Sequence, residues 1–133
     1  GSAFFACYNE CMPHERPHEK LIVWQESHKL CLQVYAITKK FPMDERFRLV
    51  SQMCRSAYSA PTNIAEGNAK RSMKDRVHFL EIAEASLEEL HYQCYLSRDL
   101  GYITVDNFLT LDDAIQRVSY LMLKLRNSLK AHE

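Results

Sequence analysis

The chain has 133 residues, 47% of them hydrophobic, and contains only three glycines and four prolines. This composition excludes the disordered and fibrous classes and suits one globular domain with a single core. The 17 basic and 17 acidic residues give a formal net charge of zero, which argues against a strongly basic nucleic-acid-binding domain. Polar side chains interrupt every apolar stretch before the ~20 residues that a membrane helix needs.

Residues 1–19 are predicted to be an N-terminal leader or a cloning remnant, outside the domain that residues 20–133 form. They contain an apolar patch but neither the basic start nor the hydrophobic stretch of a secretory signal. Cys31, Cys54 and Cys94 fall on apolar faces of predicted helices, where a free thiol acts as a small hydrophobe. Reduced cysteines and the lack of a targeting signal lead us to expect a cytoplasmic protein.

The leader also contains a candidate metal site made of two cysteines and two histidines. Cys7 and Cys11, and His14 and His18, have ligand spacings that zinc accepts. However, only two residues separate the pairs, whereas a zinc finger has about twelve residues between them to fold over the metal. We therefore predict no metal ligand here, and metal analysis of the protein would decide the matter.

The first helix is predicted from about Leu21 to Phe41, where Pro42 stops it. It has two neighbouring apolar seams, a wider stripe than a bundle helix needs. We expect the extra face to be buried against another surface, such as a second subunit. The seams consist of Val23, Leu30, Val34, Ile37 and Phe41, with Trp24, Cys31 and Tyr35 beside them.

The second helix is predicted to begin after Pro42, with Asp44 and Glu45 in its first turn, and to end at Gly67. Its apolar seam continues through Pro61, although a proline inside a helix costs roughly 3 kcal/mol. Since packing on both sides offsets such a cost, we predict one helix kinked at Pro61 instead of two helices. The seam consists of Phe47, Val50, Cys54, Ala57, Pro61 and Ile64.

The third helix is predicted to begin at Ser72, a capping residue followed by Asp75, and to end at Leu100 before Gly101. The fourth begins near Thr104 and has apolar residues at alternating intervals of three and four. Four long helices with short connections predict an all-α protein, an antiparallel up-down-up-down four-helix bundle. The fourth seam consists of Phe108, Leu111, Ile115, Val118, Met122, Leu125 and Leu129.

The sequence offers little that points to catalysis. Glu88 and His91 form one Glu-x-x-His pair of the kind that di-metal bundles use, but the other helices lack the partner ligands, so a solvated charged face is favoured. Neither a nucleophile–base arrangement nor a Gly-rich phosphate loop is recognisable. We predict a protein that is not an enzyme and has no cofactor, with a metal-dependent enzyme as the least favoured alternative.

A basic corner lies before and within the start of the third helix: Lys70, Arg71, Lys74 and Arg76. Backbone N–H groups at a helix start add to an anion-attracting field. If all four cations met phosphates of a duplex, the logarithm of the affinity would fall with a slope of roughly −3.6 against the logarithm of salt. The corner is the candidate nucleic-acid-binding site. The alternative is an ordinary solvated turn, part of whose charge Glu66 neutralises.

Three motifs of the chain are informative together: Val23-Trp24-Gln25, Ala60-Pro61-x-Asn63-Ile64-Ala65-Glu66-Gly67 and Asp99-Leu100-Gly101-Tyr102-Ile103. They resemble one bacterial family, the four-helix-bundle proteins encoded by intervening sequences in 23S rRNA genes. The resemblance covers about residues 20–130, and its most specific part contains Pro61, Asn63, Glu66 and Gly67. Two departures stand at the corner, where the chain has Ala69 in place of a second glycine and Arg76 in place of an aromatic residue.

The resemblance implies a homopentamer, which would cover the surplus apolar face of the first helix. The family is related to the accessory variability determinant of diversity-generating retroelements, a basic pentamer that associates with a reverse transcriptase and nucleic acid. The leading hypothesis is therefore a homo-oligomeric helical scaffold that contacts RNA, DNA or a nucleic-acid enzyme through the basic corner. The alternative is a protein–protein adaptor with no nucleic-acid role, whose partner binds the acidic third helix.

Overall fold

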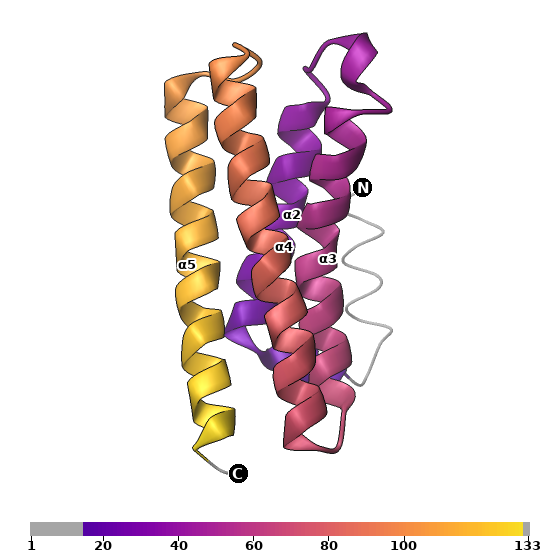
Figure 1. Cartoon of the computed structure of the whole chain (residues 1–133), viewed down its shortest axis with the longest axis vertical. Coiled ribbons are helices and arrows are strands. Elements are labelled where there is room, and N and C mark those ends of the chain that lie inside the picture. Colours follow the sequence, from indigo (N-terminus) through magenta and orange to yellow (C-terminus); the bar gives the residue numbers. More distant parts are fainter. Residues whose placement is uncertain (1–14, 132–133) are drawn as a thin grey trace.

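Four long α-helices stand side by side in the computed structural model, which describes residues 15–131 (Figure 1). Consecutive helices pack against each other, and the last packs against the first, so the four close an up-down-up-down bundle. Because the described residues contain no strand, the predicted all-α fold is confirmed. The elements are η1 (Pro17–Lys20), α2 (Ile22–Thr38), η2 (Met43–Glu45), α3 (Leu49–Ala69), α4 (Met73–Asp99) and α5 (Val105–Lys130).

The core lies between all four helices and is made mainly of aliphatic side chains. Val34, Met53, Leu90 and Met122, one from each helix, are fully buried. Burying each such side chain contributes about 1.5–3 kcal/mol, so these apolar stripes hold the helices together. The predicted seam of α5 is buried from Phe108 to Met122. None of the helices within residues 15–131 combines the length and apolar composition needed to cross a membrane.

The helix α3 runs without interruption through Pro61, which is buried on its inner face. This confirms the prediction of one helix in place of two. Proline removes one backbone hydrogen bond and crowds the preceding turn. Two side chains donate to the carbonyls of that turn: Thr62 Oγ1 lies 2.7 Å from Tyr58 O, and Asn63 Nδ2 lies 2.8 Å from Ser59 O. These contacts and the surrounding core stabilise the helix at the proline.

The predicted boundaries between the first two helices are wrong. The helix α2 ends at Thr38, because Phe41 precedes a proline and is thereby disfavoured from helical geometry. After Pro42 the chain forms a 3₁₀ turn, and α3 begins only at Leu49. A 3₁₀ turn has about three residues per turn, so it breaks the α-helical register assumed for this segment. Phe47, predicted to belong to the seam, is 84% exposed.

Gly67 was predicted to end the second helix, and this prediction is also wrong. The helix continues to Ala69, and Gly67 is buried inside it. A Cβ atom at this position would lie 2.9 Å from the Cβ of Phe79 and 3.3 Å from the carbonyl oxygen of Arg76. Glycine is therefore needed because α3 and the start of α4 approach each other closely. Gly101, in contrast, does follow α4 with a φ of 80°, as predicted.

Replacing Gly67 by alanine tests this close approach. Alanine normally stabilises a helix interior by about 1 kcal/mol relative to glycine. At residue 67 we expect the opposite, a loss of about 1–3 kcal/mol in the free energy of unfolding, because the added methyl group overpacks the contact with Phe79. Urea denaturation measures the change.

The matched control is Ala85→Gly, at an exposed position within α4. It should lose about 1 kcal/mol through helix propensity alone. If Gly67→Ala leaves the free energy of unfolding unchanged or raises it, the two helices do not need glycine in order to meet.

Candidate nucleic-acid interface

The turn between α3 and α4 places the predicted basic corner at one end of the bundle (Figure 1). Lys70 leaves α3 with an extended backbone, φ −76° and ψ 149°. Ser72 then caps α4, its hydroxyl oxygen accepting a hydrogen bond from the backbone N–H of Asp75 at 3.1 Å. Such a cap satisfies one of the free N–H groups at a helix start. The short turn therefore holds the four cations close together in space.

Two of these cations, Lys70 and Arg76, form contacts with other residues of the protein. The Nε of Arg76 donates to the backbone oxygen of Lys70 at 2.7 Å, a contact that links the start of α4 back to the end of α3. Arg76 also borders a cavity of about 20 Å³ together with Gly67 and Leu129 of α5. The ammonium group of Lys70 lies 4.9 Å from the ring centre of Phe79, a cation–π contact. These two residues therefore shape the corner as well as charging it.

The other two cations, Arg71 and Lys74, are exposed. Neither forms an ion pair with any residue from 15 to 131. Glu66 is exposed as well, and within the same range it has no ion-pair partner, so the expected neutralisation of the corner by direct pairing does not occur there. Arg71 and Lys74 are the side chains best placed to meet an anion from solution.

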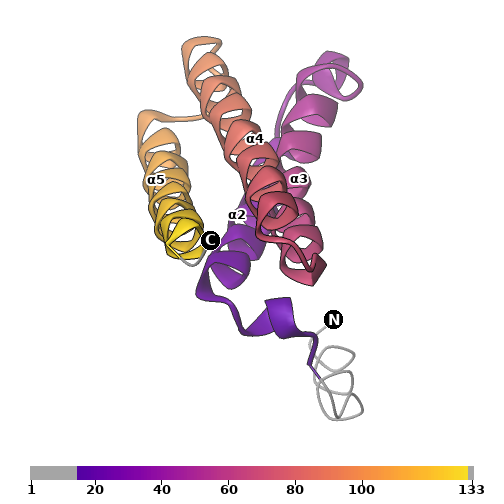
Figure 2. The ribbon, with the colours of Figure 1, turned by 60° about the horizontal axis from the view of Figure 1, so that its bottom comes forward.

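The fold adds further cations that the sequence analysis did not include. Figure 2 shows the start of α2, the α3–α4 turn and the last turn of α5 at the same end of the bundle. Arg16 borders a groove of about 310 Å³ with Glu66 and Asn68, so η1 lies against the last turns of α3. We call this region the basic end; its cations are Arg16, Lys20, Lys70, Arg71, Lys74, Arg76 and Lys130.

The two ends of the bundle differ in charge. The segments of the basic end, residues 15–20, 66–76 and 127–131, carry seven cations against four carboxylates, those of Glu15, Glu19, Glu66 and Asp75. At the opposite end, residues 39–48 and 98–106 carry five cations against four carboxylates. The excess positive charge is therefore concentrated at the basic end.

The other candidate sites do not assemble in the part of the chain that the structure describes. His91 Nε2 lies 3.2 Å from Asp112 Oδ1, whereas Glu88 is exposed. No group of three or more His, Cys, Asp or Glu side chains that could hold a metal ion occurs within residues 15–131. Of the leader ligands, His18 packs edge-on against Trp24. Cys7, Cys11 and His14 lie outside the described residues.

The cysteines of the bundle are poorly suited to nucleophilic chemistry. Cys31 and Cys94 are buried and Cys54 is half-buried, and all three are free. Burial raises the pKa of the Cys94 thiol to about 12, with a smaller contribution from the Asp112 carboxylate. Since the reactive form of cysteine is the thiolate, Cys94 stays protonated and unreactive near neutral pH.

Arg76→Ala tests whether this arginine holds the corner. We expect the free energy of unfolding to fall by about 1–2 kcal/mol, because the carbonyl of Lys70 loses its side-chain donor and the half-buried stem of Arg76 no longer packs. Lys74→Ala is the matched control, since this side chain is exposed, and should stay within about 0.5 kcal/mol of the unsubstituted protein. Equal stabilities of the two variants in urea denaturation would contradict the structural role of Arg76.

Comparison with known proteins identifies relatives of the same fold. A family model described as 23S rRNA-intervening sequence protein matches residues 19–124. A crystal structure from Bacteroides thetaiotaomicron, described as a protein with unknown function from the S23 ribosomal protein family, is similar with a TM-score of 0.72. The two chains are 21% identical, and the match covers 79% of this chain and 98% of that chain. No curated protein sequence matches the chain.

Proposed function

This chain belongs to the 23S rRNA-intervening sequence protein family, and we propose that it is a non-enzymatic, homo-oligomeric helical scaffold that binds RNA through its basic end. The observation that carries the proposal is the concentration of seven cations, against four carboxylates, at one end of a chain whose formal net charge is zero. Phosphate contacts supply most of the sequence-independent affinity for nucleic acid. A local cluster supports binding even when the whole chain is neutral.

The corner has the features that phosphate binding needs. Arg71 and Lys74 are exposed and stand next to the N-terminus of α4, a helix of 27 residues. The ammonium group of Lys70 contacts the ring of Phe79, and Arg76 donates to the backbone oxygen of Lys70. These contacts restrict where the two charges lie relative to the turn. Fixed cations lose less conformational freedom on binding than free ones. These features favour contact with the RNA backbone, which is independent of sequence.

Removing the positive charge of the corner tests the RNA-binding proposal. In Lys70→Ala/Arg71→Ala/Lys74→Ala, the affinity for single-stranded RNA should fall, and the slope of log affinity against log salt should become shallower by up to about 2.1. Fluorescence anisotropy of a labelled single strand over a range of salt concentrations measures both quantities. Arg76 stays unchanged in this variant because it also supports the fold.

The matched control removes three cations from the opposite end, Lys39→Ala/Lys40→Ala/Arg48→Ala, all of which are exposed. It should keep the affinity and the slope of the unsubstituted protein. If both triple variants behave alike, the basic end is not the RNA-binding site. If the unsubstituted protein binds no RNA, and partners captured from a lysate remain after nuclease treatment, the chain is a protein–protein adaptor.

The homo-oligomeric part of the proposal is supported by an exposed apolar surface on α2 and α3. A groove of about 500 Å³ lies there, and it is lined mainly by aromatic and aliphatic side chains, with His18, His28 and Thr62 among them. Leu32, Tyr35 and Tyr58 are each more than 40% exposed. Contiguous apolar surface of this kind usually marks an interface. We call it the apolar face, formed by Trp24, Cys31, Leu32, Tyr35, Tyr58, Pro61 and Ala65.

Charge placed on the apolar face should prevent self-association. We expect the unsubstituted protein to have several times the 15.6 kDa mass of one chain, and Leu32→Glu/Tyr35→Glu to have the mass of a single chain. Size-exclusion chromatography with light scattering measures both masses. Leu123→Glu on α5 is the control, because Leu123 is similarly exposed but lies away from this face. An unsubstituted protein of 15.6 kDa would contradict the oligomer.

A further inference from the structure

A second groove, on the outer side of the contact between α3 and α4, has a different chemical character from the apolar face. Its volume is about 310 Å³, and polar side chains from both helices line it. Such a lining is unusual where two bundle helices meet, since the facing positions of a bundle are normally apolar. The lining includes Gln52, Arg55, Tyr58, Asn63, Ser86 and Glu89. We call it the polar groove.

The floor of the polar groove is fixed by hydrogen bonds at its centre. Ser86 Oγ donates to the backbone oxygen of Ile82 at 3.1 Å, so its oxygen accepts from the hydroxyl of Ser59 at 2.8 Å. Asn63 Nδ2 in turn donates to Ser59 Oγ at 3.0 Å and to Ser59 O at 2.8 Å. The amide of Asn63 is thereby oriented, and its Oδ1 has no hydrogen-bond donor among the described residues. The floor offers a fixed acceptor.

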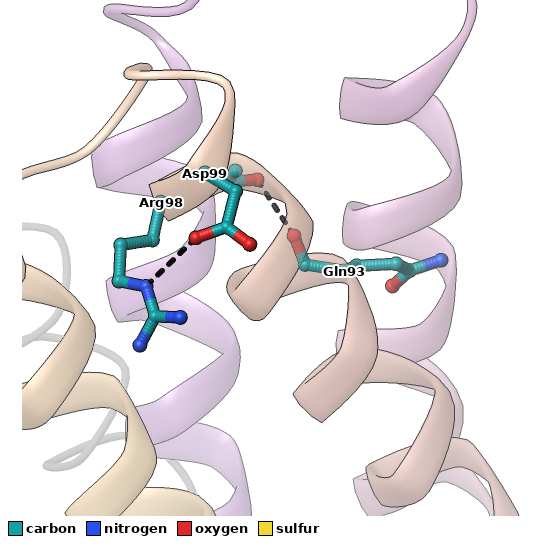
Figure 3. Close-up of polar contacts among 4 residues, drawn as sticks. Gln93, Arg98 and Asp99 are labelled. Atoms are coloured by element: carbon teal, nitrogen blue, oxygen red, sulfur yellow. Dashed lines mark hydrogen bonds and ion pairs between the residues drawn. The ribbon is translucent and has the colours of Figure 1, made fainter.

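A second set of hydrogen bonds orders the other end of the polar groove. Ser56 Oγ donates to Gln93 Oε1 at 2.6 Å, and Gln93 Nε2 donates to Glu89 Oε1 at 3.2 Å. Figure 3 shows the side chain of Gln93 extending from α4 toward the neighbouring helix, away from the Arg98–Asp99 ion pair. Because Gln93 is buried and holds one oxygen of Glu89, the carboxylate at the rim of the groove is also positioned.

The rim of the polar groove combines opposite charges with an aromatic ring. Arg55 is exposed and forms no ion pair with any described residue, and Glu89 stands across the groove on α4. Tyr58 lines both the polar groove and the apolar face, so it stands at their common border. A site with both charges repels a bare phosphate at one side and a bare cation at the other. It suits a neutral planar group that carries donors and acceptors and that has a face to stack, which describes a nucleobase.

The polar groove also leads toward the basic end. Asn63 lies on α3, and Lys70 directly follows the last residue of this helix, so the two are seven residues apart, or about 10 Å at the rise of an α-helix. Glu66 lies between them at helical spacing, on the same side of α3 as Asn63. Phe79 lies seven residues, or about two turns, before Ser86 on α4, and the ammonium group of Lys70 contacts its ring. A single strand whose backbone lies on the basic end therefore passes within reach of the polar groove.

We propose that the polar groove binds an unpaired nucleobase of the RNA whose backbone the basic end holds, with the guanidinium group of Arg55 stacking on the base and Asn63 and Glu89 meeting its edge. This inference rests on the proposed RNA-binding function and makes it more specific. It predicts a protein that prefers single-stranded segments, because the edges and faces of paired bases are not accessible to such a groove.

Two short RNA probes of equal length and charge test the inference: a single-stranded oligoadenylate and the same backbone with its bases removed. The base-bearing probe should bind the unsubstituted protein about tenfold more tightly. Arg55→Gln/Glu89→Gln should lose this advantage while keeping its affinity for the abasic probe, because one charge of each sign is removed. Both substituted side chains are exposed, so the fold should be retained. Arg48→Gln/Asp113→Asn is the control, with the same change of charge at exposed positions away from the groove.

The outcomes separate the two proposals. If neither probe binds, the RNA-binding function and the base site both fail. If both probes bind the unsubstituted protein equally, RNA binding by the basic end stands and the base site is refuted. Equal loss of the advantage in the groove variant and in the control variant also refutes it. A tenfold preference lost only in the groove variant supports the base site.

Discussion

The structure depends on one close contact, between α3 at Gly67 and the first turns of α4 at Phe79. Because glycine has no Cβ atom, α3 and α4 can pack closely next to the turn that joins them. Lys70 can then reach the ring of Phe79, and Arg76 can donate to the backbone of Lys70. A wider separation would move these cations apart and would open the polar groove above them. The charge of the basic end is thus organised by packing.

The proline in α3 belongs to the same arrangement. Pro61 is buried, and the residues around it are small or polar: Ser59 and Asn63 meet Ser86 on α4, and Thr62 donates to the preceding turn. A proline inside a helix costs roughly 3 kcal/mol, so it is tolerated where packing on both sides offsets that cost. Here the core holds one face and the hydrogen-bonded α3–α4 contact holds another. The proline, the polar groove and the glycine contact therefore form one continuous region of α3.

The sequence predicted the architecture well because long apolar stripes repeat at the helical period. The stripe of α5 from Phe108 to Met122 is buried as predicted, and the capping role of Ser72 follows from a local motif. The start of α3 was mispredicted because Phe47, in the turn between η2 and α3, continues a helical pattern of apolar residues without being buried. Gly67 was mispredicted because glycine serves both helix ends and close contacts, and only the position of Phe79 distinguishes them.

The candidate site was predictable only in its local part. Lys70, Arg71, Lys74 and Arg76 are neighbours in sequence, so their clustering at a turn required no knowledge of the fold. Arg16 and Lys130 lie at opposite ends of the chain and reach the same end of the bundle only through its topology. The polar groove was missed because its hydroxyl and amide side chains, such as Ser59 and Ser86, read individually as ordinary helix-surface residues.

Native-state hydrogen exchange tests the central claim that α3 is one cooperative helix, held through its proline by the contact with α4. The amides of Ile64 and Ala65, after the proline, should exchange with the same opening free energy as those of Met53 and Ala57 before it, equal to that of global unfolding. The account is contradicted if residues 62–69 open at a clearly lower free energy while the first half of α3 stays protected.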